Sequence, residues 1–78
     1  MNGLFSRAGA SVLTIVELES GIFLYEFRKD GRVFDTWHRT IDDAKNQAAY
    51  NFKDSVGTWN PMPADISDFR TFAREISN

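Results

Sequence analysis

The chain has 78 residues, a formal net charge of −2 and no cysteine. The lack of cysteine excludes disulfides, thiolate catalysis and cysteine-ligated metal sites, and the acidic balance argues against a general polyanion binder. Apolar residues make up 42% of the sequence, with seven Phe and two Trp among them, which predicts a packed core rather than a disordered chain.

The sequence predicts no membrane-spanning segment, and its first residues predict no secretory signal. No apolar run approaches the roughly 20 residues that span a bilayer, and the first residues lack a long apolar segment. We therefore expect a cytoplasmic protein. Residues 1–10 are rich in Gly, Ala and Ser, which predicts a flexible N-terminal arm before a single α+β domain at residues 11–78.

Three runs of aromatic and β-branched residues predict an antiparallel meander. The first strand is expected from Ser11 to Glu19, the second from Ile22 to Arg28 and the third from Arg32 to His38. Ser20-Gly21 and Asp30-Gly31 are expected to form two-residue turns between them, because Gly accepts a positive φ.

Counting outward from these turns gives the meander two different faces. One face is expected to form the core under the first helix, and it carries Val12, Val16, Leu18, Phe23, Tyr25, Phe27 and Phe34. The opposite face mixes apolar and charged side chains, so we expect the last helix, a second subunit or a partner to cover it. This register also sets Glu26 opposite Asp35 as a like-charge pair.

The first helix is expected to begin after Thr40 as N-cap and to run to about Asp54. Asp42 and Asp43 follow the cap, where carboxylates meet unpaired backbone N–H groups, and Gly57 supplies a stop. Consecutive carboxylates diverge around a helix axis, so we interpret them as caps rather than metal ligands.

A connector with two prolines follows and leaves room for a short fourth edge strand around Thr58 and Trp59. The last helix is expected from about Asp65 to Ser77, with apolar residues on one stripe. The predicted fold is therefore a three-stranded antiparallel meander with two helices, in the order β-β-β-α-(β)-α.

The densest polar group is the run Asp35-Thr36-Trp37-His38-Arg39, and His38 is the only histidine of the chain; Asp35 and His38 are its candidate catalytic pair. Along a strand they point to opposite faces, so we expect no catalytic dyad and no enzyme activity. A small hydrolase-like or metal-binding domain centred on these two residues is the weakest alternative. We expect no cofactor, because no glycine-rich phosphate loop is present.

Basic residues gather at the tip of the second hairpin, beside aromatic residues on the same strands: Arg28, Lys29, Arg32 and Arg39. Aromatic sheets with flanking cations stack bases in some nucleic-acid-binding domains. Nucleic-acid binding is thus one alternative function.

Residues 22–52 resemble a group of small uncharacterised bacterial proteins that join a β-meander to a helix. The resemblance rests on Asp30-Gly31, Asp35-Thr36-Trp37-His38, Ile41-Asp42-Asp43-Ala44 and Gln47-Ala48. It supports the fold and implies no activity. A weaker resemblance is to HicB-like antitoxin domains and double-stranded RNA-binding domains, which also place a meander before a helix. The RNA-binding type would have a Lys-rich helix start, whereas the helix start of this chain is acidic.

These observations predict a small non-enzymatic protein-interaction or regulatory module. Its partner is expected to be another protein, with a homodimer through the mixed face as one form. The expected interaction surface consists of Leu13, Ile15, Leu24, Glu26, Arg28, Val33, Asp35, Trp37 and Arg39.

Overall fold

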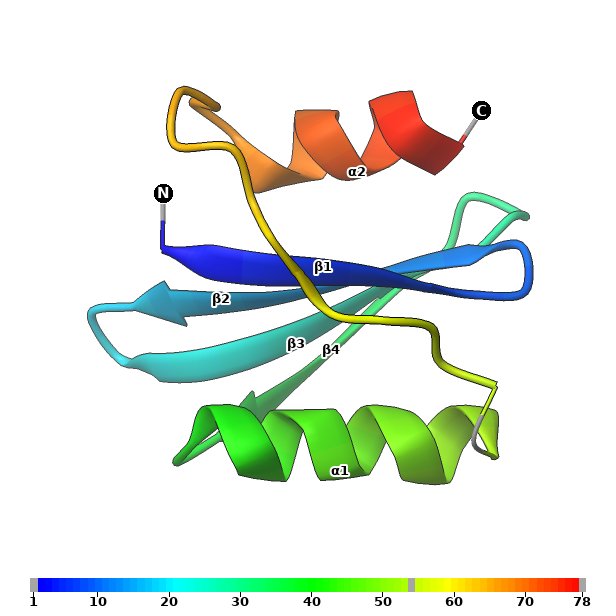
Figure 1. Cartoon of the computed structure of the whole chain (residues 1–78), viewed down its shortest axis with the longest axis horizontal. Helices are drawn as coiled ribbons and strands as arrows, with labels where there is room; N and C mark the ends of the chain where they lie inside the picture. The colour runs from blue at the N-terminus through cyan, green and yellow to red at the C-terminus, as the bar shows by residue number, and fades with distance from the viewer. Residues whose placement is uncertain (1, 54, 78) are drawn as a thin grey trace.

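An antiparallel sheet lies between two helices in the computed structural model, which describes residues 2–53 and 55–77 (Figure 1). The elements in chain order are β1 (Gly3–Ala8), β2 (Ser11–Leu18), β3 (Gly21–Phe27), β4 (Val33–His38), α1 (Ile41–Phe52), β5 (Asn60–Pro61) and α2 (Phe69–Ser77). Across the sheet the order is β4-β3-β2-β1-β5. The predicted α+β class, with an antiparallel meander and two helices, is confirmed.

The expected N-terminal arm is wrong, because β1 pairs along its whole length with β2. Gly9 (φ 59°) provides the positive φ of the turn between the two strands. Leu4 packs against the core on one face of the sheet and Phe5 on the other. The small residues of β1 are accommodated because the chain after α1 runs back beside this strand, where the Gly57 N–H donates to the Arg7 carbonyl at 2.7 Å.

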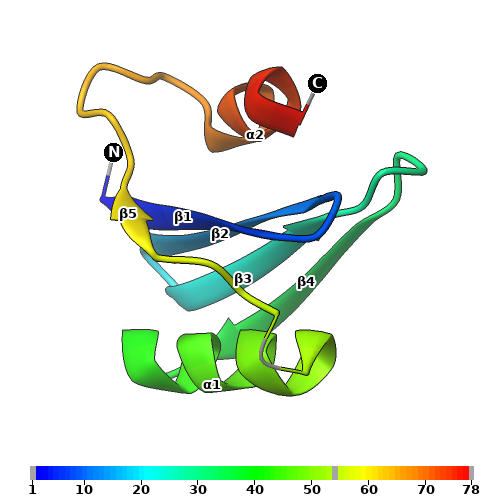
Figure 2. The same cartoon turned by 45° about the vertical axis from the view of Figure 1, so that its right-hand side comes forward.

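The two helices cover the opposite faces from those expected (Figure 2). α1 lies on the aliphatic face of the sheet, where its fully buried Ala44 and Ala48 allow a close approach. α2 lies on the aromatic face, and its Phe69 ring is 4.7 Å from that of Tyr25, centroid to centroid. Small side chains of α1 suit close packing on a branched aliphatic surface, whereas the rings of α2 pack against the rings of the aromatic face.

The register of β4 differs from the expected one by a single residue. Phe27 lies opposite Val33 rather than Phe34. Only Gly31 takes a positive φ (90°) in this turn, whereas a type I′ turn would need one at Asp30 as well. The Gly31 N–H donates to the Arg28 carbonyl at 3.0 Å, which makes a longer loop with Gly31 in the bulge position.

This shift moves every β4 side chain to the other face. Val33, Asp35 and Trp37 now share the face of α2, and Phe34 and the other even-numbered residues share the face of α1. Glu26 therefore lies opposite Phe34, and the expected like-charge pair with Asp35 is wrong.

The turn between β2 and β3 lies one residue earlier than expected, with Leu18 opposite Gly21. Leu18 is consequently at the strand end and 39% exposed, and Phe34 is 46% exposed, so neither belongs to the aromatic core as expected. The other residues of that face are buried or half-buried.

The ends of the helices follow their caps. Thr40 is the N-cap, as predicted, and its Oγ1 accepts a hydrogen bond from the Asp43 N–H at 3.0 Å. α1 ends at Phe52 because Lys53 adopts the left-handed conformation, so Gly57 is not its stop. The expected end at Asp54 lies outside the described residues.

The C-terminal part of the chain is also shifted relative to its prediction. The short edge strand is at Asn60–Pro61 rather than around Thr58 and Trp59. α2 begins at Phe69 rather than near Asp65, because the Asp68 carboxylate accepts a hydrogen bond from the Arg70 N–H at 3.0 Å. Among the residues described, no helix is both long and apolar enough to cross a membrane.

Candidate functional site

The strand β4 forms one edge of the sheet and is exposed along most of its length (Figures 1 and 2). Its only strand neighbour in the described part of the chain is β3. At the other edge the sheet ends in the two-residue strand β5, in which Pro61 cannot donate a hydrogen bond. β4 is therefore the longer of the two open edges.

The backbone of β4 presents its free hydrogen-bonding groups at the odd-numbered residues. The Arg28 N–H donates to the Arg32 carbonyl at 2.8 Å, which makes these two a hydrogen-bonded pair. Pairs in an antiparallel ladder alternate, so Phe34, Thr36 and His38 bond to β3. The N–H and C=O groups of the residues between them point away from β3, toward the open side.

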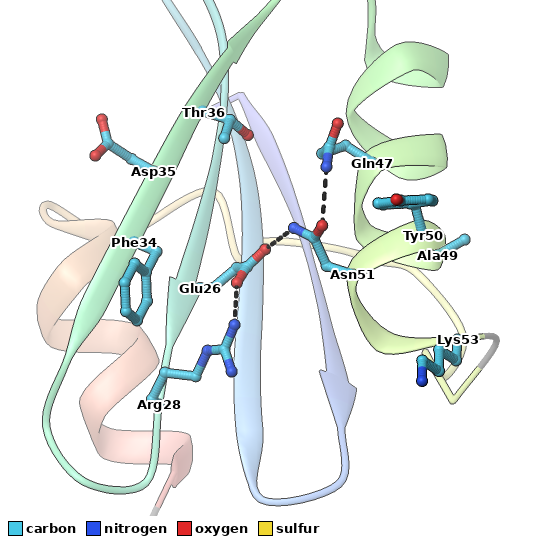
Figure 3. A pocket seen from close by; sticks show the side chains of 10 residues that line it. All are labelled: Glu26, Arg28, Phe34, Asp35, Thr36, Gln47, Ala49, Tyr50, Asn51 and Lys53. Atoms are coloured by element: carbon cyan, nitrogen blue, oxygen red, sulfur yellow. Dashed lines mark hydrogen bonds and ion pairs between the residues drawn. The ribbon is translucent and has the colours of Figure 1, made fainter.

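A groove of about 960 Å³ lies between β4 and α1 (Figure 3). Its lining comes from both elements and from β3: Glu26, Arg28, Phe34, Asp35, Thr36, Gln47, Ala49, Tyr50, Asn51 and Lys53. Two aromatic side chains in it are open to solvent, Phe34 at 46% and Tyr50 at 81%. The Asp35 side chain points away from α1.

A polar network forms the floor of this groove. Glu26 is only 3% exposed, and its carboxylate accepts hydrogen bonds from Arg28 at 2.7 Å and from the Asn51 side-chain amide. Gln47 in turn donates to Asn51 at 2.8 Å (Figure 3). A buried carboxylate needs such partners, because an unpaired charge away from water is costly. The network therefore ties α1 to β3 beneath the groove.

Arg28 also joins the network to two aromatic rings, of which Phe34 lines the groove. Its guanidinium carbon lies 5.1 Å from the centre of the Phe34 ring and 4.9 Å from that of Phe52. Cation–π contacts of this kind orient the rings as well as the cation. Phe34 is thereby held at the rim of the groove.

Trp37 presents a second aromatic surface on the opposite face of β4. Its indole N–H donates to the Ser20 carbonyl at 2.9 Å, and the ring lies over Gly21. The side chain is nevertheless 53% exposed. β4 therefore carries exposed, positioned aromatic groups on both of its faces.

The structure divides the predicted interaction surface into two parts. Leu13, Ile15, Leu24 and Glu26 are buried on the face that α1 covers, so the expectation that they form an open interface is wrong. The position of α1 accounts for this correction, because it covers this face of β2 and β3 instead of the aromatic face.

The remaining predicted residues stay accessible. Val33, Asp35 and Trp37 are exposed on the α2 face of β4, and Arg39 follows the strand. Arg28 is half-buried beside the groove. The prediction thus found part of the β4 edge but assigned it to the wrong face.

The sequence analysis missed the α1 side of the groove, which includes Gln47, Tyr50 and Asn51. Tyr50 lies off the apolar stripe of α1 that contains Ala44 and Ala48. An aromatic residue on the polar side of a helix was the available signal for an exposed contact.

Asp35 and His38 lie on opposite faces of β4, and they do not converge. His38 Nε2 is instead 2.7 Å from Thr36 Oγ1 on its own face. Asp42 and Asp43 lie in the first turn of α1. Within residues 2–53 and 55–77, no three His, Asp or Glu side chains form a group suited to a metal ion.

Comparison with known proteins gives no assignment. No family model, curated protein or solved structure matches the chain. The resemblance of residues 22–52 to small bacterial proteins therefore stays a prediction, and any functional interpretation depends on the geometry of the chain itself.

Proposed function

We propose that this chain is a small non-enzymatic interaction module that binds an extended segment of protein along β4. The observation that carries the proposal is the open edge of β4, which is long, exposed and bordered by a groove. An added strand would pair with the outward backbone groups, and every second side chain of it would enter the groove beside Phe34 and Tyr50.

The composition of β4 supports this proposal. Soluble proteins protect exposed edges with proline, lysine, bulges or a covering segment, because an unprotected edge pairs with other chains. β4 contains neither proline nor lysine, and it exposes Val33, Phe34 and Trp37. Such an edge is a liability unless pairing is its function.

The proposal can be tested with a library of displayed random peptides selected against the immobilised protein. Asp35→Pro removes an outward N–H without removing a hydrogen bond to β3, so it should abolish binding of the selected peptides. Thr58→Pro, at an exposed position outside the sheet, is the matched control.

Amide chemical shifts measured by NMR would locate the bound peptide. We expect the largest changes in β4 and around Tyr50. Peptides that bind Asp35→Pro as well as the unmodified chain, or that shift amides far from β4, would contradict the proposal.

Nucleic-acid binding is a second candidate function, favoured by a basic pocket at the β3–β4 hairpin. The pocket, of about 320 Å³, is lined by Lys29, Arg32 and Arg74 together with Arg28, and none of the described residues that line it is acidic. Two of these cations already have acidic partners, since Arg28 pairs with Glu26 and Arg32 with Asp30.

This candidate predicts that a labelled oligonucleotide binds and is released as salt rises from about 50 to 200 mM. Lys29→Ala and Arg74→Ala should each weaken binding and reduce its salt dependence, measured by fluorescence anisotropy. Binding that is independent of salt, or unchanged in both variants, would argue against it.

A further inference from the structure

We infer that the segment that occupies the β4 edge is β4 of a second copy of this chain, paired antiparallel about a two-fold axis at Thr36. The inference rests on the proposed function and commits it to one occupant. Its basis is the pattern of outward backbone groups and side chains along Val33–His38, which is complementary to itself in one register.

The backbone limits the registers that are available. In an antiparallel pair, two residues with outward groups face each other and exchange both hydrogen bonds. Odd-numbered residues of β4 carry the outward groups, so they must face odd-numbered residues of the second copy. The axis must therefore pass through a residue and not between two residues.

The same condition follows from the faces of the sheet. A two-fold axis normal to the sheet keeps α1 of both copies on one side and α2 of both on the other. Each residue then faces one of the same parity, so Phe34 meets an even-numbered residue. Both conditions exclude the register in which Val33 would face His38.

Two registers satisfy these conditions and keep most of β4 paired. With the axis at Asp35, the two Asp35 carboxylates would lie directly opposite each other, which is unfavourable. With the axis at Thr36, the two threonines face each other, Asp35 faces Trp37 of the second copy, and Phe34 faces His38 of the second copy. An axis at Phe34 or at Trp37 would leave about half of the strand unpaired, because β4 spans only Val33–His38.

The Thr36 register also matches charges and apolar groups. On the α2 face of β4, Asp35 has two diagonal neighbours in the second copy, which are Asp35 and Arg39, the residue that follows β4. The long Arg39 side chain can reach both carboxylates and offset their like charge. On the other face, the groove beside α1 continues into that of the second copy. The exposed rings of Phe34 and Tyr50 would then border one shared surface.

The absence of cysteine from the chain allows a direct test by single-cysteine cross-linking. At the axis, Thr36 belongs to a non-hydrogen-bonded pair, whose Cα atoms are about 4.5 Å apart and can accept a disulfide. Thr36→Cys should form a covalent dimer under mild oxidation. Thr58→Cys, at an exposed threonine outside the sheet, is the matched control. Its cross-linking rate should be lower than that of Thr36→Cys by about 10-fold or more.

Two further variants report the register. Phe34→Cys alone should not cross-link rapidly, and neither should His38→Cys alone. In each case the two equivalent cysteines of the dimer would be about 13 Å apart. An equimolar mixture of the two should give a disulfide between the different chains. Rapid cross-linking of Asp35→Cys instead of Thr36→Cys would overturn the assigned register.

Light scattering over a concentration series tests the dimer without cysteine. The unmodified chain should be a dimer, and Asp35→Pro should raise the dissociation constant by about 100-fold, because each dimer loses two edge hydrogen bonds. Circular dichroism would show whether this variant is folded. If it is not, the cysteine measurements decide the question independently.

The outcomes separate this inference from the proposed function. A monomer at all concentrations, with Thr36→Cys no more reactive than Thr58→Cys, overturns the second copy as occupant. In that case peptides that bind β4 would leave the interaction function standing. A dimer that cross-links at none of the β4 positions would overturn the β4 interface itself.

Discussion

Replacing Gly21 by alanine should destabilise the protein by about 2–4 kcal/mol, although Gly21 lies at a strand end and not in the core. Gly21 has a φ of 144°, in a region that side chains rarely adopt. A Cβ at this position would lie 2.1 Å from Nε1 of Trp37, so the indole would have to move. Backbone strain contributes about 1–3 kcal/mol, and loss of the hydrogen bond from Trp37 to Ser20 about 1 kcal/mol.

A double-mutant cycle separates these two contributions. In a Trp37→Ala background, the loss of unfolding free energy caused by Gly21→Ala should come from backbone strain alone. This loss should be smaller than in the unmodified chain by about 1 kcal/mol or more. Trp59 is present in all four variants and reports urea unfolding by fluorescence. With a slope of about 1 kcal/mol per molar urea, the difference corresponds to about 1 M in the midpoint. Equal costs in the two backgrounds would refute the close approach of the indole as a cause.

Three further changes test the packing and the caps. Thr14→Val should raise the urea midpoint by about 1 M, because the fully buried Thr14 hydroxyl has no hydrogen-bond partner among the described residues. A lower midpoint would mean that this hydroxyl does form a hydrogen bond. Ala48→Leu should cost about 1–3 kcal/mol in urea unfolding by overpacking the contact of α1 with the sheet, whereas little loss would show that the helix can move outward. Hydrogen bonds from the Arg70 N–H and the Thr71 hydroxyl lower the pKa of Asp68. The ionised carboxylate therefore contributes to stability above about pH 4, and this contribution is lost as the pH falls through the lowered pKa. The stability difference between the unmodified chain and Asp68→Asn should therefore shrink in urea titrations below about pH 4, and a difference that does not change with pH would contradict this role.

Local signals in the sequence were sufficient for β2, β3, β4 and α1. Alternation of apolar residues located the strands, and Thr40 with the acidic residues after it located the start of α1. β1 was missed because Gly3, Ser6 and Ala8 are small, and the burial of Ser6 and Ala8 depends on a segment about fifty residues later in the chain. Composition alone carries no sign of that contact.

The candidate site was harder to predict because it depends on register. Asp30-Gly31 is compatible with a two-residue turn and with the longer loop that forms, and the difference of one residue exchanges the faces of Phe34 and Trp37. Both faces of the sheet are largely apolar, so hydrophobicity could not assign the helices. Side-chain size decides it, with Ala44 and Ala48 on one helix and large rings on the other.

The pairing of β1 with β5 has a consequence for the chain as it is synthesised. Gly3 accepts a hydrogen bond from the Met62 N–H at 3.0 Å, so the outer edge of β1 is completed by residues that leave the ribosome much later. At about 5–20 residues per second, β1 to β4 and α1 are complete for roughly 0.4–2 s before β5 is synthesised. During that interval the sheet has two unpaired edges, and its aromatic face has no helix over it. Slow translation between α1 and β5 should therefore favour aggregation more than slow translation anywhere earlier in the chain.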